Sequence, residues 1–204
     1  MSHDHGHHPK HRFDPARAAT LLDPKRRLID DPLTLVRQMG VGEGMRVADL
    51  GCGAGFFTLP LLEAVGDGGH VTAVDVQPEV LEFFRQRAPD APNLALTEAD
   101  LTATGLPDDA FDAVFIAFTL HETPAMAALA EAKRILKPGG VAIVMEWGEF
   151  GPCPEREPGR KAGPPEDHRL LAAAMREHLR ANALEEVEYG ERLGGCHYWI
   201  RARA

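Results

Sequence analysis

The chain has 204 residues, of which 44% are hydrophobic and 26% charged, and these proportions are ordinary for a globular protein of one domain. Its net charge of −9 disfavours a large nucleic-acid-binding surface, because such a surface needs cationic side chains to neutralise phosphates. No apolar run approaches the roughly 18 residues of a membrane-spanning helix, and the polar N-terminus does not resemble a signal peptide, so we expect a cytoplasmic protein.

Residues 1–12 form a histidine-rich tail that we expect to be disordered. Such a tail chelates divalent metal incidentally but defines no ordered metal site, so no metal ligand is predicted. Residues 13–40 follow as a helical cap, because Asp14 and Asp31 each precede a proline and each can serve as a helix N-cap.

Residues 41–150 alternate short apolar runs with helical periodicity, which predicts a parallel sheet with right-handed crossovers. Strands are predicted at 45–50, 70–75, 93–97, 111–117 and 141–147, and helices at 56–65, 78–87 and 124–136. Residues 151–204 add a Pro/Gly-rich loop, a helix over 167–183 and two final strands. We therefore predict a single α/β domain over 13–204, with helices on both faces of a mostly parallel sheet.

The most informative stretch is the loop after the first predicted strand, where glycines alternate at Gly51, Gly53 and Gly55. Glycine permits positive φ and a close approach of the backbone to a ligand, and open α/β sheets bind ligands at this edge. A dinucleotide loop has a glycine where this chain has Phe56, and Asp49 before the loop would repel a pyrophosphate. Asp49 suits a ligand with an amino group and no phosphate, such as S-adenosylmethionine.

Asp75 ends the second predicted strand, where an acid about 20 residues beyond the glycine loop can accept hydrogen bonds from both ribose hydroxyls. This role serves NAD and an adenosine cofactor equally. Asp75 therefore predicts an adenosine-containing ligand without choosing between the two.

Several motifs occur in order: Asp49-Leu50-Gly51-Cys52-Gly53-Ala54-Gly55, Val74-Asp75, Ala99-Asp100-Leu101, Phe111-Asp112-Ala113-Val114 and Leu136-Lys137-Pro138-Gly139-Gly140. With them the chain resembles the class I S-adenosylmethionine-dependent methyltransferases. Leu120-His121-Glu122 and the segment 163–170 make it similar to the small ubiquinone/menaquinone-biosynthesis-like type. The resemblance implies a Rossmann-like, doubly wound sheet of seven strands with an antiparallel C-terminal hairpin. It also implies methyl transfer to a small-molecule acceptor, with oxygen or carbon favoured.

The same resemblance implies a cofactor site for S-adenosylmethionine made of Asp49, Gly51, Cys52, Gly53, Gly55, Asp75, Val76, Asp100, Leu101 and Phe118. In it, Asp49 and Gly51 hold the methionine part and Asp75 the ribose. Val76 packs on the adenine, and Asp100 accepts from the adenine amino group. A turn cap is the alternative role of Asp100.

His121 follows the fourth predicted strand, in the loop that faces the transferred methyl group in this fold, and its ordinary pKa near neutrality suits a catalytic base. A histidine hydrogen-bonded at a helix start is the alternative. Trp147, His168 and Arg169 are further candidates on the substrate side, and Arg169 suits a carboxylate or phosphate. The Asn/Asp-Pro-Pro-aromatic stretch of nucleobase amino methyltransferases is absent, which argues against that activity.

The three cysteines, Cys52, Cys153 and Cys196, lack CxxC spacing and predict no disulfide framework. Their spacing also gives no support to a thiolate site for a metalloid substrate. Two rival functions remain open: a nicotinamide-dependent oxidoreductase, and a non-catalytic protein that binds S-adenosylmethionine or metal. The sequence predicts neither the methyl acceptor nor the oligomeric state.

Overall fold

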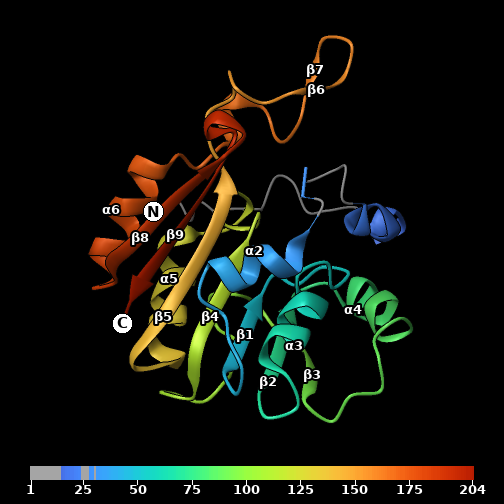
Figure 1. Ribbon diagram of the computed structural model, residues 1–204, viewed down its shortest axis with the longest axis vertical. Helices are drawn as coiled ribbons and strands as arrows, with labels where there is room; N and C mark the ends of the chain where they lie inside the picture. Colours follow the sequence, from blue (N-terminus) through green and yellow to red (C-terminus); the bar gives the residue numbers. More distant parts are fainter. Residues whose placement is uncertain (1–14, 24–27, 30) are drawn as a thin grey trace, which may run out of the picture.

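The centre of the computed structural model, which describes residues 15–23, 28–29 and 31–204, is a seven-stranded sheet (Figure 1). Its strand order is β3-β2-β1-β4-β5-β9-β8. The first five strands in this order are parallel, and β9 runs antiparallel to both β5 and β8. The predicted Rossmann-like sheet with an antiparallel C-terminal hairpin is therefore confirmed.

The strands of this sheet are β1 (Arg46–Leu50), β2 (His70–Asp75), β3 (Leu94–Glu98), β4 (Phe111–Ala117), β5 (Leu136–Trp147), β8 (Glu185–Arg192) and β9 (His197–Arg203). The α-helices are α2 (Pro32–Gln38), α3 (Thr58–Val65), α4 (Pro78–Arg85), α5 (Ala125–Ile135) and α6 (Ala172–Ala181). The 3₁₀ helices are η1 (Pro15–Leu22), η2 (Leu120–Glu122), η3 (Glu166–His168) and η4 (Leu193–Gly195). A separate small hairpin pairs β6 (Glu155–Glu157) with β7 (Arg160–Lys161).

Three predicted elements differ from the structure. The fifth strand begins at Leu136, because Leu136 already pairs with Phe111 ahead of a register shift. The helix predicted over 167–183 is replaced by η3, an extended Arg169 and the shorter α6. The predicted Pro/Gly-rich loop, which begins the segment 151–204, contains the small β6–β7 hairpin. The predicted N-cap at Asp31 is confirmed, since its Oδ1 accepts from Thr34 N at 3.0 Å. Asp14 and the tail 1–12 lie outside the described residues.

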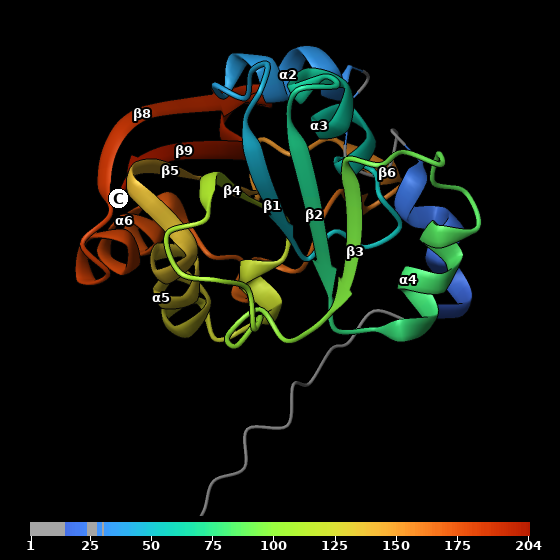
Figure 2. The ribbon, with the colours of Figure 1, turned by 90° about the horizontal axis from the view of Figure 1, so that it is seen from below.

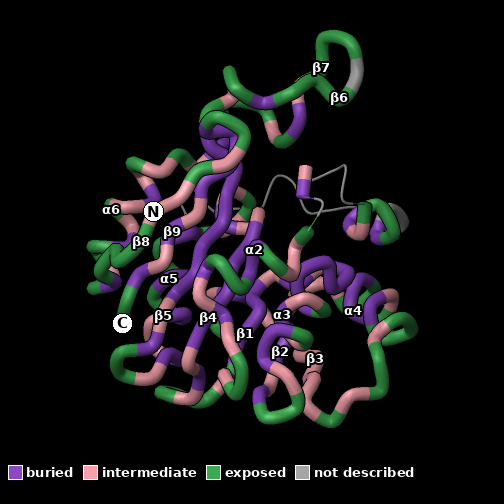
Figure 3. Tube along the Cα trace, in the orientation of Figure 1, coloured by how far each residue is buried: buried purple, intermediate pink, exposed green. Residues whose placement is uncertain are grey.

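Helices cover both faces of the sheet, with α2 and α3 on one face and α5 and α6 on the other (Figure 2). Side chains alternate between the faces along each strand: Val47 packs toward α2 and α3, whereas Ala48 packs toward α5 and α6. The central strands are consequently buried, while the β6–β7 hairpin is exposed (Figure 3). Leu21 of η1 packs against Ala54 of the glycine loop, so the N-terminal segment borders the carboxyl edge of β1.

Position 55 requires glycine for two reasons: its backbone conformation and the close packing around it. Its φ is +88°, and a Cβ placed on it would overlap the ring of Phe84 in α4. We expect Gly55→Ala to lower the free energy of unfolding by about 2–3 kcal/mol, from backbone strain and overpacking together. Gly44→Ala is the matched control, because Gly44 also has positive φ (+77°) but open space around it. Equal losses in urea titrations of the two variants would contradict the clash with Phe84.

Candidate active site

The glycine loop brings the ends of two neighbouring strands into contact. Gly51, Gly53 and Gly55 have φ of +79°, +53° and +88°, which other residues adopt only with strain. A Cβ placed on Gly51 would lie 2.6 Å from side-chain atoms of Thr119, in the loop after β4. The predicted cofactor loop therefore lies directly against the loop that carries His121.

Asp75 lies at the carboxyl end of β2 and contacts the glycine loop. Its Oδ2 accepts from Gly53 N at 2.9 Å, and its Oδ1 accepts from Gln77 N at 3.0 Å. Burial raises the pKa of this carboxyl, while the backbone hydrogen bonds from Gln77 and Gly53 oppose the rise. The structure thus places Asp75 where the sequence predicted a ribose ligand, and that role stays a prediction.

Asp49, which precedes the glycine loop, and Cys52, which belongs to it, are both buried. Asp49 Oδ2 accepts from Thr58 Oγ1 of α3 at 2.6 Å, which fixes the carboxylate. Burial, followed by the negative charges of Asp49 and Asp75, raises the pKa of Cys52 well above its usual range, so its sulfur stays a thiol. Cys52 packs among apolar side chains that include Phe84.

Asp100 and Leu101 follow β3 in a separate turn. Asp100 Oδ1 accepts from both the backbone N and the Oγ1 of Thr102, at 2.8 and 2.6 Å. Asp100 is therefore a turn cap, which was the alternative role, and its contact with adenine stays a prediction. Leu101 is buried and Val76 is half-buried beside β2.

The residues around the glycine loop fit an adenosine ligand that is cationic rather than phosphorylated. The segments 49–55, 74–77 and 100–102 supply three carboxylates and no lysine, arginine or histidine. Carboxylates attract an amino group or a sulfonium and accept from ribose hydroxyls, whereas they repel a diphosphate. S-adenosylmethionine has the first set of groups and lacks a phosphate.

His121 belongs to a buried ion pair at the ends of β4 and β5. Its Nδ1 lies 2.8 Å from Oε2 of Glu146, and its Nε2 lies 3.6 Å from Oε1 of Glu122. Glu146 is fully buried, and its two oxygens also accept from the backbone N of Leu120 and Trp147 at 2.8 and 3.2 Å. Glu146 thus fixes both the η2 loop and the imidazole that the loop carries.

The charges around His121 change its chemical role. Burial alone would lower the pKa of His121. The negative charge of Glu146, the hydrogen bonds to Glu122 and Glu146, and the charge of Glu122 together outweigh burial and raise this pKa to about 10. The imidazole is then protonated at neutral pH and has no lone pair with which to accept a proton. This argues against the base role predicted from the sequence and favours a cationic hydrogen-bond donor.

Three rings gather at the carboxyl edge of the sheet, and we name Phe118, Trp147 and His197 the ring cluster. The ring centroids lie 5.2 Å apart for Phe118 and Trp147, 5.1 Å for Phe118 and His197, and 4.5 Å for Trp147 and His197. Phe118 has a positive φ of +55° and is half-buried, whereas the other two are buried. The cluster therefore forms an aromatic wall next to the glycine loop.

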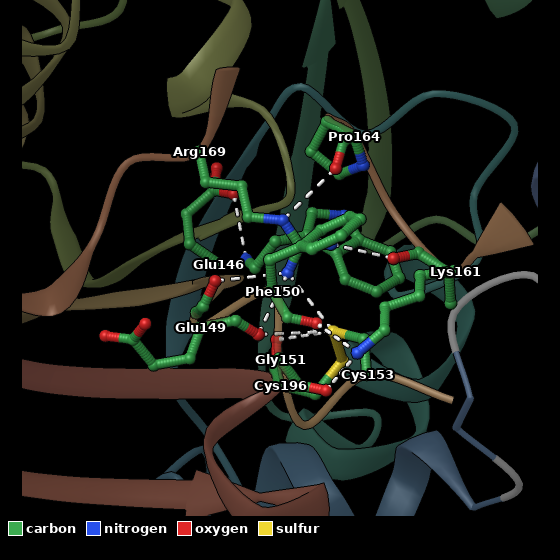
Figure 4. The surroundings of a disulfide bond; sticks show 12 residues. Glu146, Glu149, Phe150, Gly151, Cys153, Lys161, Pro164, Arg169 and Cys196 are labelled. Atoms are coloured by element: carbon green, nitrogen blue, oxygen red, sulfur yellow. Dashed lines mark hydrogen bonds between the residues drawn. A yellow bond between two sulfur atoms is a disulfide. The ribbon is translucent and has the colours of Figure 1, made fainter. Parts of the chain in front are cut away.

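Arg169 is buried and holds the loop after β5 together (Figure 4). Its guanidinium donates to Pro164 O at 3.1 Å, Gly148 O at 3.1 Å, Glu149 O at 3.3 Å, Ala162 O at 2.7 Å and Cys153 Sγ at 3.1 Å. It also lies over the rings of Trp147 and Phe150. All three guanidinium nitrogens are thus engaged internally, which argues against the predicted grip on a substrate anion. His168 is exposed and lies 3.9 Å from Asp167, so its predicted substrate role gains no support.

A disulfide bond joins Cys153 to Cys196, which corrects the prediction that the cysteines form no disulfide framework (Figure 4). The two cysteines are 43 residues apart in sequence. They meet because the C-terminal hairpin lies along the loop after β5, where Gly148 N donates to Cys196 O at 2.8 Å. Such a long-range pairing depends on the fold and leaves no signature in the spacing.

Reduction of this disulfide is expected to destabilise the protein by about 2–4 kcal/mol, because the bond closes a long loop in the unfolded chain. In a chain of this size the melting temperature should fall by on the order of 10 °C. The measurement compares melting with and without dithiothreitol. Cys52→Ala should keep this sensitivity and Cys153→Ser/Cys196→Ser should lose it. A dithiothreitol shift in the double variant would show that another cause is at work.

Within the described part of the chain, no cluster of three histidine, cysteine or acidic residues is arranged to hold a metal ion. The histidine-rich tail lies outside that part. The helices that the structure describes are all too short or too polar to cross a bilayer.

Two residues of the site did not have their contacts predicted from the sequence. Glu146, expected only to line the pocket with Trp147, is the last residue but one of a buried strand, and the rule that selected Asp49 and Asp75 at strand ends also applies to it. His197 had no such signal, because its place in the ring cluster depends on the antiparallel pairing of β9 with β5.

Residues 47–140 match the family model of a methyltransferase domain. A demethylmenaquinone methyltransferase of Staphylococcus aureus (strain MRSA252) is 36% identical over 116 residues, which are 56% of this chain and 48% of the relative. This chain thus spans about half the length of the curated relatives it matches. A structure of a SAM-dependent methyltransferase from Aquifex aeolicus has a TM-score of 0.82 and 27% identity over 94% of this chain and 99% of that one. The [4+2]-cyclase SpnF has a TM-score of 0.68 and 21% identity over 87% and 80% of the two chains, and so shares the fold.

A Rossmann-like sheet with carboxylates around a glycine loop at its carboxyl edge is typical of proteins that bind an adenosine cofactor. The matched domain and the likeness to the Aquifex aeolicus structure over nearly the whole chain both support a class I S-adenosylmethionine-dependent methyltransferase. S-adenosylmethionine is the cofactor of that class.

Proposed function

We propose that this chain methylates an oxygen or carbon atom of a small molecule that carries an acidic hydroxyl group. The observation that carries the proposal is the contact between Gly51 and Thr119, which sets the carboxylate-lined cofactor loop against the loop of His121. A donor that is already a sulfonium needs an aligned, electron-rich acceptor more than it needs a protein nucleophile.

The protein's own residues supply this alignment and activation. Asp49, Asp75 and the glycine loop would hold S-adenosylmethionine, which supplies an electrophilic methyl group when bound. The imidazolium of His121, fixed by Glu146, would donate a hydrogen bond to the acceptor oxygen and favour its ionised form. The ring cluster would exclude water from the reacting atoms.

A quinol or phenol is the acceptor class that we propose. The aromatic wall of Phe118 and Trp147 suits a planar ring, and one relative is named a demethylmenaquinone methyltransferase. The finer placement among ubiquinone/menaquinone-biosynthesis-like enzymes, the absence of a nucleic-acid partner and a cytoplasmic location belong to this proposal. A disulfide such as Cys153–Cys196 is unusual for that compartment, so a cytoplasmic location implies that the two cysteines are reduced there.

Two measurements test the proposed function. Calorimetry should show binding of S-adenosylmethionine and S-adenosylhomocysteine in preference to NADH. Transfer of a tritiated methyl group should then be screened across 1,4-naphthoquinol, catechol, 1-naphthol, benzoate and glycine, and we expect product only from the hydroxylated rings. Preferential binding of NADH, or transfer confined to the carboxylates, would overturn the proposal.

A further inference from the structure

His197 has no hydrogen-bond partner among the described residues although it is fully buried. It opens β9 opposite Trp147, and neither ring nitrogen is paired with any described residue. A buried polar atom without a partner destabilises the folded protein, and few such atoms occur in native proteins. Two on one imidazole indicate that a group outside the described residues completes their hydrogen bonding.

A second unpaired group lies on the neighbouring strand. Arg192 faces His197 in the β8–β9 register, and its Nη1 is also buried without a partner in the described chain. Directly opposed residues of antiparallel strands project to the same side of the sheet. One guanidinium donor and one imidazole therefore stand together without a protein acceptor.

The imidazole of His197 is uncharged. Burial, followed by the positive charges of Arg192 and Arg169, lowers its pKa to about 3. A neutral imidazole offers one N–H donor and one lone pair. Together with Arg192 it can donate to an oxygen and accept from an O–H, which is the hydrogen-bonding pattern of a hydroxyl group.

Phe118 packs against His197, with the two ring centroids 5.1 Å apart. Phe118 is the only half-buried member of the ring cluster, and it precedes Thr119, which touches the glycine loop. Its positive φ is unusual for an aromatic residue, and strain of this kind gathers at functional sites. A rotation of the Phe118 side chain would open the face of His197 toward the cofactor loop.

We infer that His197 and Arg192 bind a hydroxyl oxygen of the methyl acceptor while Phe118 and Trp147 hold its aromatic ring. His197 is then a specificity-determining residue. The inference rests on the proposed function and names the residues that select the methyl acceptor by binding its hydroxyl group. A protonated amine would meet the like charge of Arg192, and an apolar ring would leave the unpaired nitrogens buried, so both should bind more weakly than a phenol.

The test removes both nitrogens and keeps a ring. In His197→Phe loaded with S-adenosylhomocysteine, we expect the affinity for 1-naphthol to fall 10- to 100-fold by calorimetry. Affinity for 1-methylnaphthalene and for S-adenosylhomocysteine should stay within twofold. The melting temperature should hold or rise, since no unpaired nitrogen is then buried. His197→Gln, which restores a polar group, should recover part of the 1-naphthol affinity.

His70→Phe is the matched control, because His70 begins β2 at the opposite edge of the sheet and should leave 1-naphthol binding unchanged. Three results would overturn the inference: unchanged 1-naphthol affinity in His197→Phe, a lower melting temperature there with normal binding, or equal affinity of the wild type for 1-naphthol and 1-methylnaphthalene. The last comparison needs no S-adenosylhomocysteine. Failure of S-adenosylhomocysteine to bind the wild type would instead overturn the proposed function.

Discussion

Asp75→Ala is expected to weaken binding of S-adenosylmethionine by about 10²–10⁴-fold. The carboxylate is predicted to accept from two ribose hydroxyls, and each hydrogen bond to a charged group contributes about 1.5–3 kcal/mol. The substitution also frees Gly53 N, which donates to Asp75 Oδ2 at 2.9 Å, so the glycine loop loses a support. Calorimetry with S-adenosylhomocysteine, which has the same ribose, measures the loss without turnover.

Two further variants separate the ribose contact from the support of the loop. Asp75→Asn retains one oxygen for the backbone but lacks the charge, so it should fall between the wild type and Asp75→Ala. Asp112→Ala is the control, because Asp112 is a carboxylate that accepts from Arg46 N at the opposite edge of the sheet. Affinity of Asp75→Ala within twofold of the wild type would show that Asp75 does not hold the ribose.

Strand ends were the part of the site that the sequence predicted well. Asp49, Gly51 and Asp75 sit at the carboxyl edge because an apolar run fixes where a buried strand stops, and the polar residue that follows must emerge at the edge. Parallel strands then bring these ends together whatever the details of packing. The same local logic predicted the order of strands and helices over residues 41–150.

The acceptor side was predicted poorly because its geometry arises from long-range contacts. The disulfide, the buried Arg169 and the unpaired His197 all depend on how the C-terminal hairpin lies against the loop after β5. Local sequence composition does not distinguish an arginine that donates to backbone carbonyl oxygens from an arginine that binds the carboxylate of a substrate. Likewise, an ordinary pKa near neutrality was expected for His121, because the carboxylate that raises this pKa lies 25 residues away in sequence.

His121→Gln is expected to lower kcat/KM for a hydroxylated acceptor by about 10²–10³-fold, the size of effect seen when a donor to a developing oxyanion is removed. The pH dependence distinguishes this role from that of a base. A base becomes active as pH rises through its pKa, whereas an imidazolium donor is lost there. Because the pKa of His121 is raised to about 10, we expect turnover to be insensitive to this group near neutrality and to fall as pH rises through about 10.

The stability of the folded protein should also fall as pH rises, in the same direction as turnover. A histidine whose pKa is higher in the folded protein than in the unfolded chain stabilises the fold fully below its unfolded pKa of 6.5. That stabilisation is lost as pH rises from 6.5 toward about 10. Melting temperatures across this range give a readout that is independent of any acceptor, and His121→Gln should flatten the part of the profile that His121 causes.

Glu146→Gln provides the sharpest form of this test. Attraction to the buried Glu146 is the largest of the interactions that raise the pKa of His121, so its removal should move the alkaline fall in turnover to lower pH. Glu122→Gln should move the fall less, because Glu122 is more exposed and its nearest oxygen lies 3.6 Å from Nε2. Turnover that instead rises through neutral pH in the wild type would restore His121 as the base. If neither Glu146→Gln nor Glu122→Gln changes the pH at which turnover falls, the group that titrates there is not His121.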